Sequence, residues 1–388
     1  MKKWFFIVFS LYMINGFAQN NNVQQTVSLI SEDSLVNYVK QLTGLHPLAD
    51  GTYIKSRYMG SAGNSLACTY IKQKLTDWNV AFDTMNFGST GTNIIAKIPG
   101  LRSDKVIVYG AHYDAVGSNN PNLIYPGADD NASGTAAVLE AARVCAGKQF
   151  PVTLHLIFWD EEEPGLLGSK ALVNEYLQGN KLVAYINQDM IAWSPNNDSV
   201  VEIHTRPNGY SVQLANKVVD VINKYEVPLI PVVQNPGDPN SDHGSFWAQN
   251  LTAVGINEIY NGPKMNPNWH QMSDTFGTFN VNYFYQMAKL GTTVVLDLTY
   301  DSLLLGIEDK ALQHQLVVTP NPILHTLNLS GVTTSGILRI YNLQGLKVMQ
   351  QNYTSNHEVN CNQLQKGMYF IEFINKEGMT FYSKFIKE

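Results

Sequence analysis

The chain has 388 residues, 44% of them hydrophobic, which is enough to bury a large core and to form two or three folding units. Its 26 basic and 32 acidic residues give a formal net charge of -6, and neither sign forms a long run. This balance excludes a broad basic surface, so we expect no nucleic-acid partner.

The first 18 residues have the pattern of a secretory signal peptide. Lys2 and Lys3 precede a short apolar run over 4–14, and Gly16-Phe17-Ala18 forms a cleavage site of the small-x-small kind. A membrane anchor, the alternative, requires roughly 20 apolar residues. We expect cleavage after Ala18 and export of a mature protein without a transmembrane segment, to the medium or the cell surface.

Residues 19–304 are expected to form one α/β domain. A helical pattern extends from residue 29 to about 75, and strand-like runs follow at 92–98, 105–109 and 152–158. A further helix starts near Ser133, and strands alternate with helices through Leu298. The pattern predicts a twisted, mixed, mainly parallel sheet flanked by helices on both faces. In such sheets the functional residues gather at the carboxyl ends of strands.

The pattern of predicted secondary structure changes after about Leu305. Short strand-like runs without helices follow at 326–329, 337–341, 368–373 and 381–385. This spacing predicts a small C-terminal β-sandwich over residues 305–388, appended to the α/β domain.

Three cysteines, Cys68, Cys145 and Cys361, are too few for a disulfide scaffold. We expect Cys68 and Cys145 to be buried free thiols on helices, with a bridge between them as the alternative. The fold therefore depends on its apolar core.

Polar clusters end several of the apolar runs. They lie at 110–114, 126–134, 158–169, 187–190 and 268–275. In the first cluster, residues two apart in extended chain point the same way, so Asp114 can fix the tautomer of His112, as in metal sites. Two of the clusters also have structural explanations that involve no metal. Residues 126–134 could be an ordinary helix start, and the four acids at 160–163 could lie in a solvated loop.

Histidines mixed with carboxylates suit zinc better than calcium, whose sites use oxygen ligands alone. Three carboxylates together with a hydroxide also offset the charge of two divalent ions. The clusters therefore predict a two-metal site.

The five clusters, in this order, resemble the motif set of the M28 family of zinc peptidases, which includes secreted bacterial leucyl aminopeptidases. Further matches lie at 57–61 and 241–247. The resemblance covers about residues 26–300, and the ordered set is specific where any one motif would be weak. It implies two zinc ions per chain, with five ligands: His112, Asp129, Glu163, Asp189 and His270.

In the family pattern His112 and Asp189 hold one ion, Glu163 and His270 hold the other, and Asp129 bridges the two. The same resemblance implies two further roles in the reaction. Glu162 becomes the general base that acts on the metal-bound water, and Asp114 orients His112.

Asp160 and Glu161 have no counterpart in the family motif, so we expect both to stay in a solvated loop. Pro164 restricts Glu163 to an extended backbone, and alternation then sends Glu162 and Glu163 in different directions. One carboxylate can thus bind metal while its neighbour faces the water.

Other polar and aromatic residues near the motifs have weaker assignments. Asp242 and His243 are expected outside the metal ligands, and Glu258 either holds the amino group of a substrate or is a surface acid. Four ring residues are candidates for a side-chain pocket, with core packing as the alternative: Phe246, Trp247, Tyr260 and Trp269.

The tail has its own resemblance, to the type A C-terminal sorting domain of the type IX secretion system of Bacteroidota. The matching segments are 319–322, 340–345, 364–370 and 384–387. The resemblance implies handling by that machinery and removal of the tail after export. A carbohydrate- or protein-binding sandwich is the alternative.

Together these features predict an exported two-zinc aminopeptidase that removes amino-terminal, mainly apolar, residues from peptide substrates. Three alternatives remain open: a glutaminyl cyclase with one zinc ion, a carboxypeptidase or dipeptidase with the same ligands, and a non-catalytic binding domain.

Overall fold

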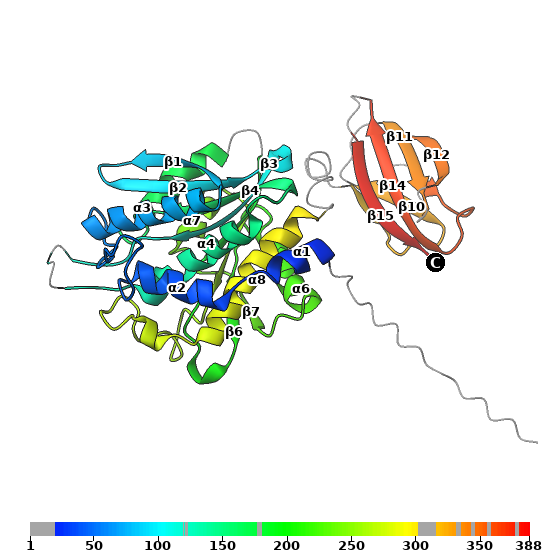
Figure 1. Cartoon of the computed structure of the whole chain (residues 1–388). Coiled ribbons are helices and arrows are strands. Elements are labelled where there is room, and N and C mark those ends of the chain that lie inside the picture. The colour runs from blue at the N-terminus through cyan, green and yellow to red at the C-terminus, as the bar shows by residue number, and fades with distance from the viewer. Residues whose placement is uncertain are drawn as a thin grey trace, which may run out of the picture. The chain divides into compact units, whose positions relative to one another are not determined.

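The structure is a computed structural model of the chain that describes residues 20–118, 120, 123–176, 181–301, 316–330, 335–342, 346–354, 358–376 and 380–388. It divides into two compact units between Tyr300 and Asp301 (Figure 1). The predicted signal peptide and the predicted domain boundary after residue 304 both lie outside the described residues.

A mixed eight-stranded sheet, in the order β1-β2-β4-β3-β5-β8-β6-β7, forms the centre of the first unit. The strands are β1 (Ala81–Phe87), β2 (Gly91–Ile98), β3 (Gly100–His112), β4 (Phe150–Trp159), β5 (Leu182–Gln188), β6 (Val200–His204), β7 (Ile230–Gln234) and β8 (Ala253–Asn257). The middle strands β4, β3, β5 and β8 run parallel. β1, β2 and β6 pair antiparallel with their inner neighbours, and the outermost β7 runs parallel to β6. The predicted mixed, mainly parallel sheet is confirmed.

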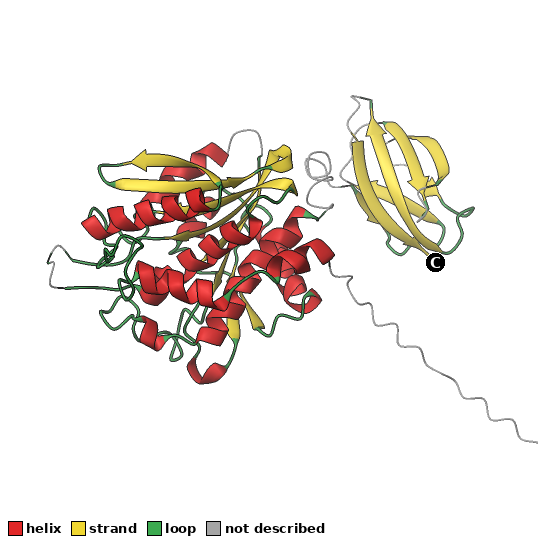
Figure 2. Cartoon of the chain, viewed as in Figure 1, coloured by secondary structure: helices red, strands yellow, loops and turns green. Residues whose placement is uncertain are grey.

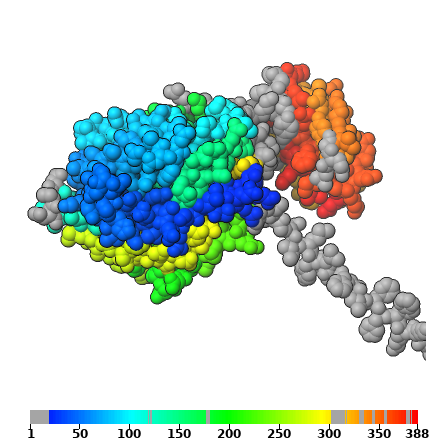
Figure 3. Space-filling view, in the orientation of Figure 1, coloured from blue at the N-terminus to red at the C-terminus, as the bar shows by residue number. Residues whose placement is uncertain are grey.

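Helices cover both faces of this sheet. On one face lie α3 (Ala62–Asp77), α4 (Gly134–Cys145), α6 (Ser211–Lys224) and α8 (Val281–Thr299). Two helices pack over α4 and α8, namely α1 (Asn21–Val27) and α2 (Glu32–Leu42), and their blue residues lie beside the yellow ones of α8 in Figure 3. The other face carries α5 (Leu167–Leu172) and α7 (Asp242–Ala248). Within the part of the chain that is described, none of the helices combines the length and apolarity that a bilayer span requires.

Capping residues explain where several of these helices begin. The side chain of Ser31 accepts a hydrogen bond from the amide of Ser34 at the start of α2. Asn280 caps α8 in the same way, through the amide of Tyr283. Such caps pair amides that have no partner within the helix, and each contributes about 1 kcal/mol.

The core on the α5 and α7 side is aromatic. Tyr185 and Phe246 pack with ring centroids 4.3 Å apart, and Trp159 lies against both. Phe246 and Trp247 are buried here, so they belong to the core and not to a substrate pocket. Cys68 in α3 and Cys145 in α4 are buried and free, as predicted, and Cys361 is also buried and free.

The second unit shows only strands and loops among its described residues (Figure 2). One sheet has the order β13-β10-β9 and the other β12-β11-β14-β15. The strands are β9 (Val317–Thr319), β10 (Thr326–Ser330), β11 (Gly336–Tyr341), β12 (Lys347–Tyr353), β13 (Val359–Asn360), β14 (Gly367–Asn375) and β15 (Thr380–Lys387). Leu327, Leu338, Phe373 and Phe385 are buried in its own core, and the predicted C-terminal β-sandwich is confirmed.

Candidate active site

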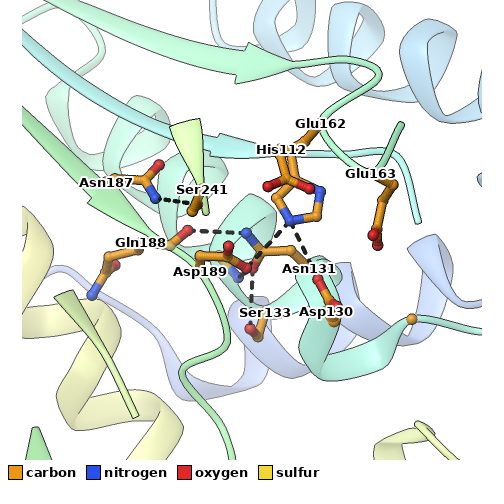
Figure 4. A network of polar contacts seen from close by, with 12 residues as sticks. His112, Asp130, Asn131, Ser133, Glu162, Glu163, Asn187, Gln188, Asp189 and Ser241 are labelled. Atoms are coloured by element: carbon orange, nitrogen blue, oxygen red, sulfur yellow. Dashed lines mark hydrogen bonds and ion pairs between the residues drawn. The ribbon is translucent and has the colours of Figure 1, made fainter. Parts of the chain in front are cut away.

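The candidate site lies at the carboxyl edge of the central parallel strands. His112 is the last residue of β3, Asp189 directly follows β5, and Glu162 and Glu163 come from the loop after β4. Parallel neighbours end at the same edge of a sheet, so the three connections meet there. Figure 4 shows these side chains around the imidazole of His112.

Asp130 lies between two histidines that come from distant parts of the chain. Its Oδ1 is 3.3 Å from Nε2 of His112, and its Oδ2 is 3.2 Å from Nε2 of His270. Nε2 of His112 is also 3.2 Å from Oδ1 of Asp189, and Nε2 of His270 is 3.1 Å from Oε2 of Glu163. The Nε2 atom of each imidazole thus faces two carboxylates, and Asp130 belongs to both sets.

The structure corrects the predicted place of Asp129. Its carboxylate accepts hydrogen bonds from the amides of Ile191 and Ala192 at 3.0 and 2.9 Å and from Nδ2 of Asn266 at 2.8 Å. Neighbouring residues send their side chains in different directions, so only one of the two aspartates faces the histidines. That residue is Asp130, and Asp129 holds the backbone after β5.

Asp114 connects the end of β3 to the loop after β4. Its Oδ1 lies 3.3 Å from Nδ1 of His112 and accepts the amide of Glu162 at 3.0 Å, while its Oδ2 accepts the amide of Glu163 at 3.1 Å. One buried carboxylate therefore sets both the ring of His112 and the backbone that carries the two glutamates.

Glu162 and Glu163 have different surroundings. Oε1 of Glu163 accepts the amide of Val116 at 2.9 Å, and its Oε2 faces His270. The side chain of Glu162 lines the cleft in front of His112. Burial raises the pKa of Glu163 to about 7 and raises that of Glu162 well above its usual range, although the charge of His112 opposes the shift of Glu162.

The same groups act on the histidines in the opposite sense. Burial tends to lower the pKa of His270, but its contacts with Asp130 and Glu163 outweigh that effect and raise the pKa to about 10. For His112, the nearby charges of Glu162 and Asp189 likewise overcome burial and raise its pKa. The cluster is thus rich in negative charge and stabilises a cation.

The donor set fits metal ions. His112, Asp130 and Asp189 can offer one ligand atom each within 4.8 Å of one another, and so can Asp130, Glu163 and His270. In the described residues, these carboxylates form ion pairs with the two histidines and with no lysine or arginine. Nitrogen and carboxylate ligands in this ratio suit zinc.

Two residues hold the loop that carries Asp130, and neither was assigned a role from the sequence although both lie in matching segments. The carboxylate of Asp274 accepts the amides of Asp129 and Asp130 at 2.9 and 3.0 Å. The buried guanidinium of Arg57 donates to four backbone carbonyls at 2.7–2.9 Å: those of Leu42, Tyr113, Pro126 and Gly127. These bonds tie the loop after β3 to the segment before Asp130.

The expectation of a solvated loop for Asp160 and Glu161 is wrong, because both are buried. Asp160 accepts hydrogen bonds from the hydroxyl of Tyr113 at 2.7 Å, from Nδ2 of Asn64 at 2.8 Å and from the amide of Thr92 at 2.9 Å. Burial raises its pKa to about 6. The first two acids of the block therefore anchor the loop from which Glu162 and Glu163 project.

Glu258 is not a surface acid, and it is not among the residues that line the cleft. It is fully buried, and its Oε2 accepts the amides of Ala192 and Trp193. Asp242 and His243 are also buried, in the first turn of α7, and lie outside the groups that can hold a metal among the described residues.

A cleft of about 540 Å³ opens in front of the cluster. Its lining includes Tyr260 and Trp269, two of the four rings for which a pocket and core packing were both open, together with Glu162, Glu163, Asp130, Asp189 and His270. Trp269 stacks on His270 with ring centroids 4.0 Å apart. A small peptide end fits such a space.

Comparison with known proteins agrees with this geometry. Residues 93–295 match peptidase family M28. The chain belongs to this family. This membership makes it a metallopeptidase. Residues 317–388 match the secretion system C-terminal sorting domain, so the second unit marks the M28 peptidase for export.

Among curated relatives, leucine aminopeptidase 1 of Paracoccidioides brasiliensis (strain Pb03) is 27% identical over 300 residues, which cover 72% of this chain and 74% of the relative. Among solved structures, the LapA aminopeptidase of Legionella pneumophila has a TM-score of 0.63 at 21% identity, covering 72% of this chain and 75% of the other.

Two further structures share the fold. A zinc aminopeptidase from Bacillus subtilis has a TM-score of 0.60 at 14% identity and covers 69% of this M28 chain and 95% of its own. A glutaminyl cyclase from Bacteroides thetaiotaomicron has a TM-score of 0.55 at 22% identity, with 69% and 98% covered. At these identities the likeness concerns the fold alone.

Proposed function

We propose that this M28 peptidase is an exported two-zinc aminopeptidase that removes amino-terminal residues from peptides. The observation that carries the proposal is Asp130, whose two oxygens face His112 and His270, while Glu162 lines the same cleft. The names of relatives, including leucine aminopeptidase 1, support removal of residues from the amino terminus of the substrate.

In this proposal each metal ion has one histidine, one carboxylate of its own and a share of Asp130. His112 and Asp189 hold the first ion, and His270 and Glu163 hold the second. Asp114 positions His112 through its Nδ1, which leaves Nε2 for the metal. In this proposal Asp130, and not Asp129, is the ligand that the two ions share.

Zinc bound in these positions would lower the pKa of a shared water and polarise the scissile carbonyl. Glu162 is the general base in this proposal: it accepts the proton of the attacking water and donates it to the leaving amine. Its buried setting, which raises its pKa, favours holding that proton between the two transfers. Trp269 and Tyr260 line the cleft beside His270.

The proposal is tested by hydrolysis of a panel of aminoacyl arylamides by the zinc-loaded protein, with and without a chelator. We expect activity that the chelator abolishes and that added zinc restores. A peptide with a blocked amino terminus is the control, and it should stay intact. Absence of hydrolysis across the whole panel contradicts the proposal.

A glutaminyl cyclase is the second candidate, because enzymes of that name share the fold. It requires one zinc ion and no attacking water. Metal analysis separates the two, since the aminopeptidase proposal requires two zinc ions per chain. Cleavage of the blocked peptide at its carboxyl end would instead indicate a carboxypeptidase.

We further propose that the predicted signal peptide directs entry into the periplasm and that type IX machinery then recognises the sorting domain and removes it. The mature enzyme would then be released or held at the cell surface. Intact-mass measurement of the exported protein tests this: loss of both ends supports it, and a full-length exported chain contradicts it.

A further inference from the structure

We propose that Asp238 makes the side-chain pocket of the cleft select peptides whose first residue is basic, lysine or arginine. The proposal rests on the aminopeptidase function given above. It extends the predicted apolar preference, because the pocket has apolar walls for the stem of a long side chain and a carboxylate for its end.

Asp238 differs from the other acids of the cleft. Of the remaining four, Asp130, Glu163 and Asp189 belong to the two groups described above that can hold a metal, and Glu162 belongs to a third such group, with His112 and Glu163. Asp238 lies outside those groups and is half-buried. In the described part of the chain it forms no ion pair.

The backbone of Asp238 is fixed on both sides by buried histidines. Its amide donates to Nδ1 of His204 at 3.0 Å, and its carbonyl accepts from Nε2 of His243 at 2.8 Å. His204 is held in turn by Glu202, at 3.1 Å. The carboxylate is therefore preorganised, which lowers the entropic cost of binding a ligand.

Only one oxygen of this carboxylate is occupied. Oδ1 of Asp238 accepts the amide of Asn240 at 2.8 Å, and among the described residues Oδ2 has no partner. Lys170 also lines the cleft, but its ammonium donates to the carbonyl of Gly165 at 2.9 Å. A free oxygen in a half-buried pocket is suited to a cation of the substrate.

A row of neighbouring rings connects the surroundings of Asp238 with those of His270. Tyr260 lies 5.9 Å from the ring of His204 and 6.3 Å from that of Trp269, which stacks on His270. Burial raises the pKa of Tyr260, and the negative charges of nearby acids raise it further. These acids are Asp189, Asp130, Asp238 and Glu162. Asp238 therefore lines the same cleft as the candidate metal ligands without belonging to the groups that can hold a metal.

The walls between these points suit an aliphatic stem. Met190, Met265 and the ring of Tyr260 line the same cleft. Methionine side chains adapt to different shapes, and lysine or arginine can lay its methylene groups on such a surface while the charge reaches a polar partner. Leucine and methionine fit the walls but leave Oδ2 of Asp238 unpaired.

The test compares lysyl and norleucyl arylamides, whose side chains have the same aliphatic length and differ in charge. For the unmodified zinc-loaded protein at low salt we expect kcat/KM to be about two- to fivefold higher for the lysyl substrate, the range of a partly exposed ion pair. The ratio should fall as the salt concentration rises. A ratio of one at low salt overturns the proposal without any variant.

Asp238→Asn keeps the shape and the acceptor for the amide of Asn240. We expect it to remove the lysyl preference and to leave norleucyl hydrolysis unchanged. Asp220→Asn, which removes one exposed charge from α6, is the matched control and should keep the preference. Asp238→Lys should raise hydrolysis of a glutamyl substrate.

The outcomes separate this proposal from the function on which it rests. If neither arylamide is hydrolysed, the aminopeptidase proposal fails. If norleucyl is hydrolysed with no lysyl preference, only the role of Asp238 fails. An equal fall for both substrates in Asp238→Asn means that Asp238 acts on the common peptide backbone and not on the side chain, which also overturns the proposal.

Discussion

Oδ2 of Asp130 lies 3.2 Å from Nε2 of His270, although the two residues are far apart in the chain. The contact exists because Asp274 accepts the amide of Asp130 and so anchors its loop beside the segment of His270. The contact places the carboxylate of Asp130, which precedes α4 in the chain, between the two histidines of the candidate metal site.

Asp130→Asn should therefore remove the shared ligand. We expect loss of most bound zinc and of activity, because an amide has one oxygen and carries no charge. Atomic emission of the dialysed protein and arylamide hydrolysis measure the two effects.

Asp129→Asn is the matched variant in the neighbouring position. We expect it to keep two zinc ions and to lose about 1–3 kcal/mol of stability, since the amide group presents donors to Asn266 where a carboxylate accepted. If the Asp129 variant loses the metal and the Asp130 variant keeps it, the original assignment to Asp129 was right.

Glu162→Gln should lower kcat by roughly 10²–10⁴ and leave the zinc content unchanged, because general base catalysis needs an ionisable carboxylate. Glu163→Gln should instead weaken zinc binding, since Glu163 faces His270. Zinc titration with a competing chelator and steady-state kinetics separate the two effects. Equal zinc loss in both variants would show that the two roles are not divided in this way.

Arg57→Met should destabilise the fold by about 3 kcal/mol or more, because several buried carbonyls lose their hydrogen-bond donor at once. It should also weaken zinc binding by loosening the loops of Asp114 and Asp130. Urea unfolding and zinc titration provide the measurements. Arg206→Met, which removes one bond to the carbonyl of Gly237, is the control and should cost about 1 kcal/mol.

His243 should make stability depend on pH. Burial lowers its pKa to about 3, from 6.5 in its ordinary state. As the pH falls below 6.5, His243 takes up a proton in the unfolded chain but not in the folded chain. The contribution of His243 to the free energy of unfolding is therefore complete above pH 6.5 and is lost as the pH falls towards 3. The loss approaches about 1.4 kcal/mol per pH unit within that window.

His243→Gln removes this titration, so its urea midpoint should fall less steeply between pH 6.5 and 4 than that of the unmodified protein. His155, whose pKa burial also lowers, to about 4, titrates in both proteins and cancels in the comparison. Parallel curves for the two proteins would mean that His243 can take up its proton in the folded state.

The strands of the sheet could be predicted because their apolar patterns are local. The runs at 92–98 and 152–158 coincide closely with β2 and β4. The short strand β7 had a weaker signal because Pro231 interrupts its apolar run. Burial of Asp160 was also missed, because its partners Asn64, Thr92 and Tyr113 come from other segments.

The ordered motifs alone determined the family, the kind of ligand and the edge of the sheet at which the site forms, because residue type and spacing encode them directly. Tertiary structure decided which of two adjacent aspartates meets both histidines and which acids serve as anchors. It also placed Asp238 in the same cleft but outside the groups that can hold a metal. Such choices depend on side-chain direction and on partners from distant segments, which are fixed only when the chain has folded.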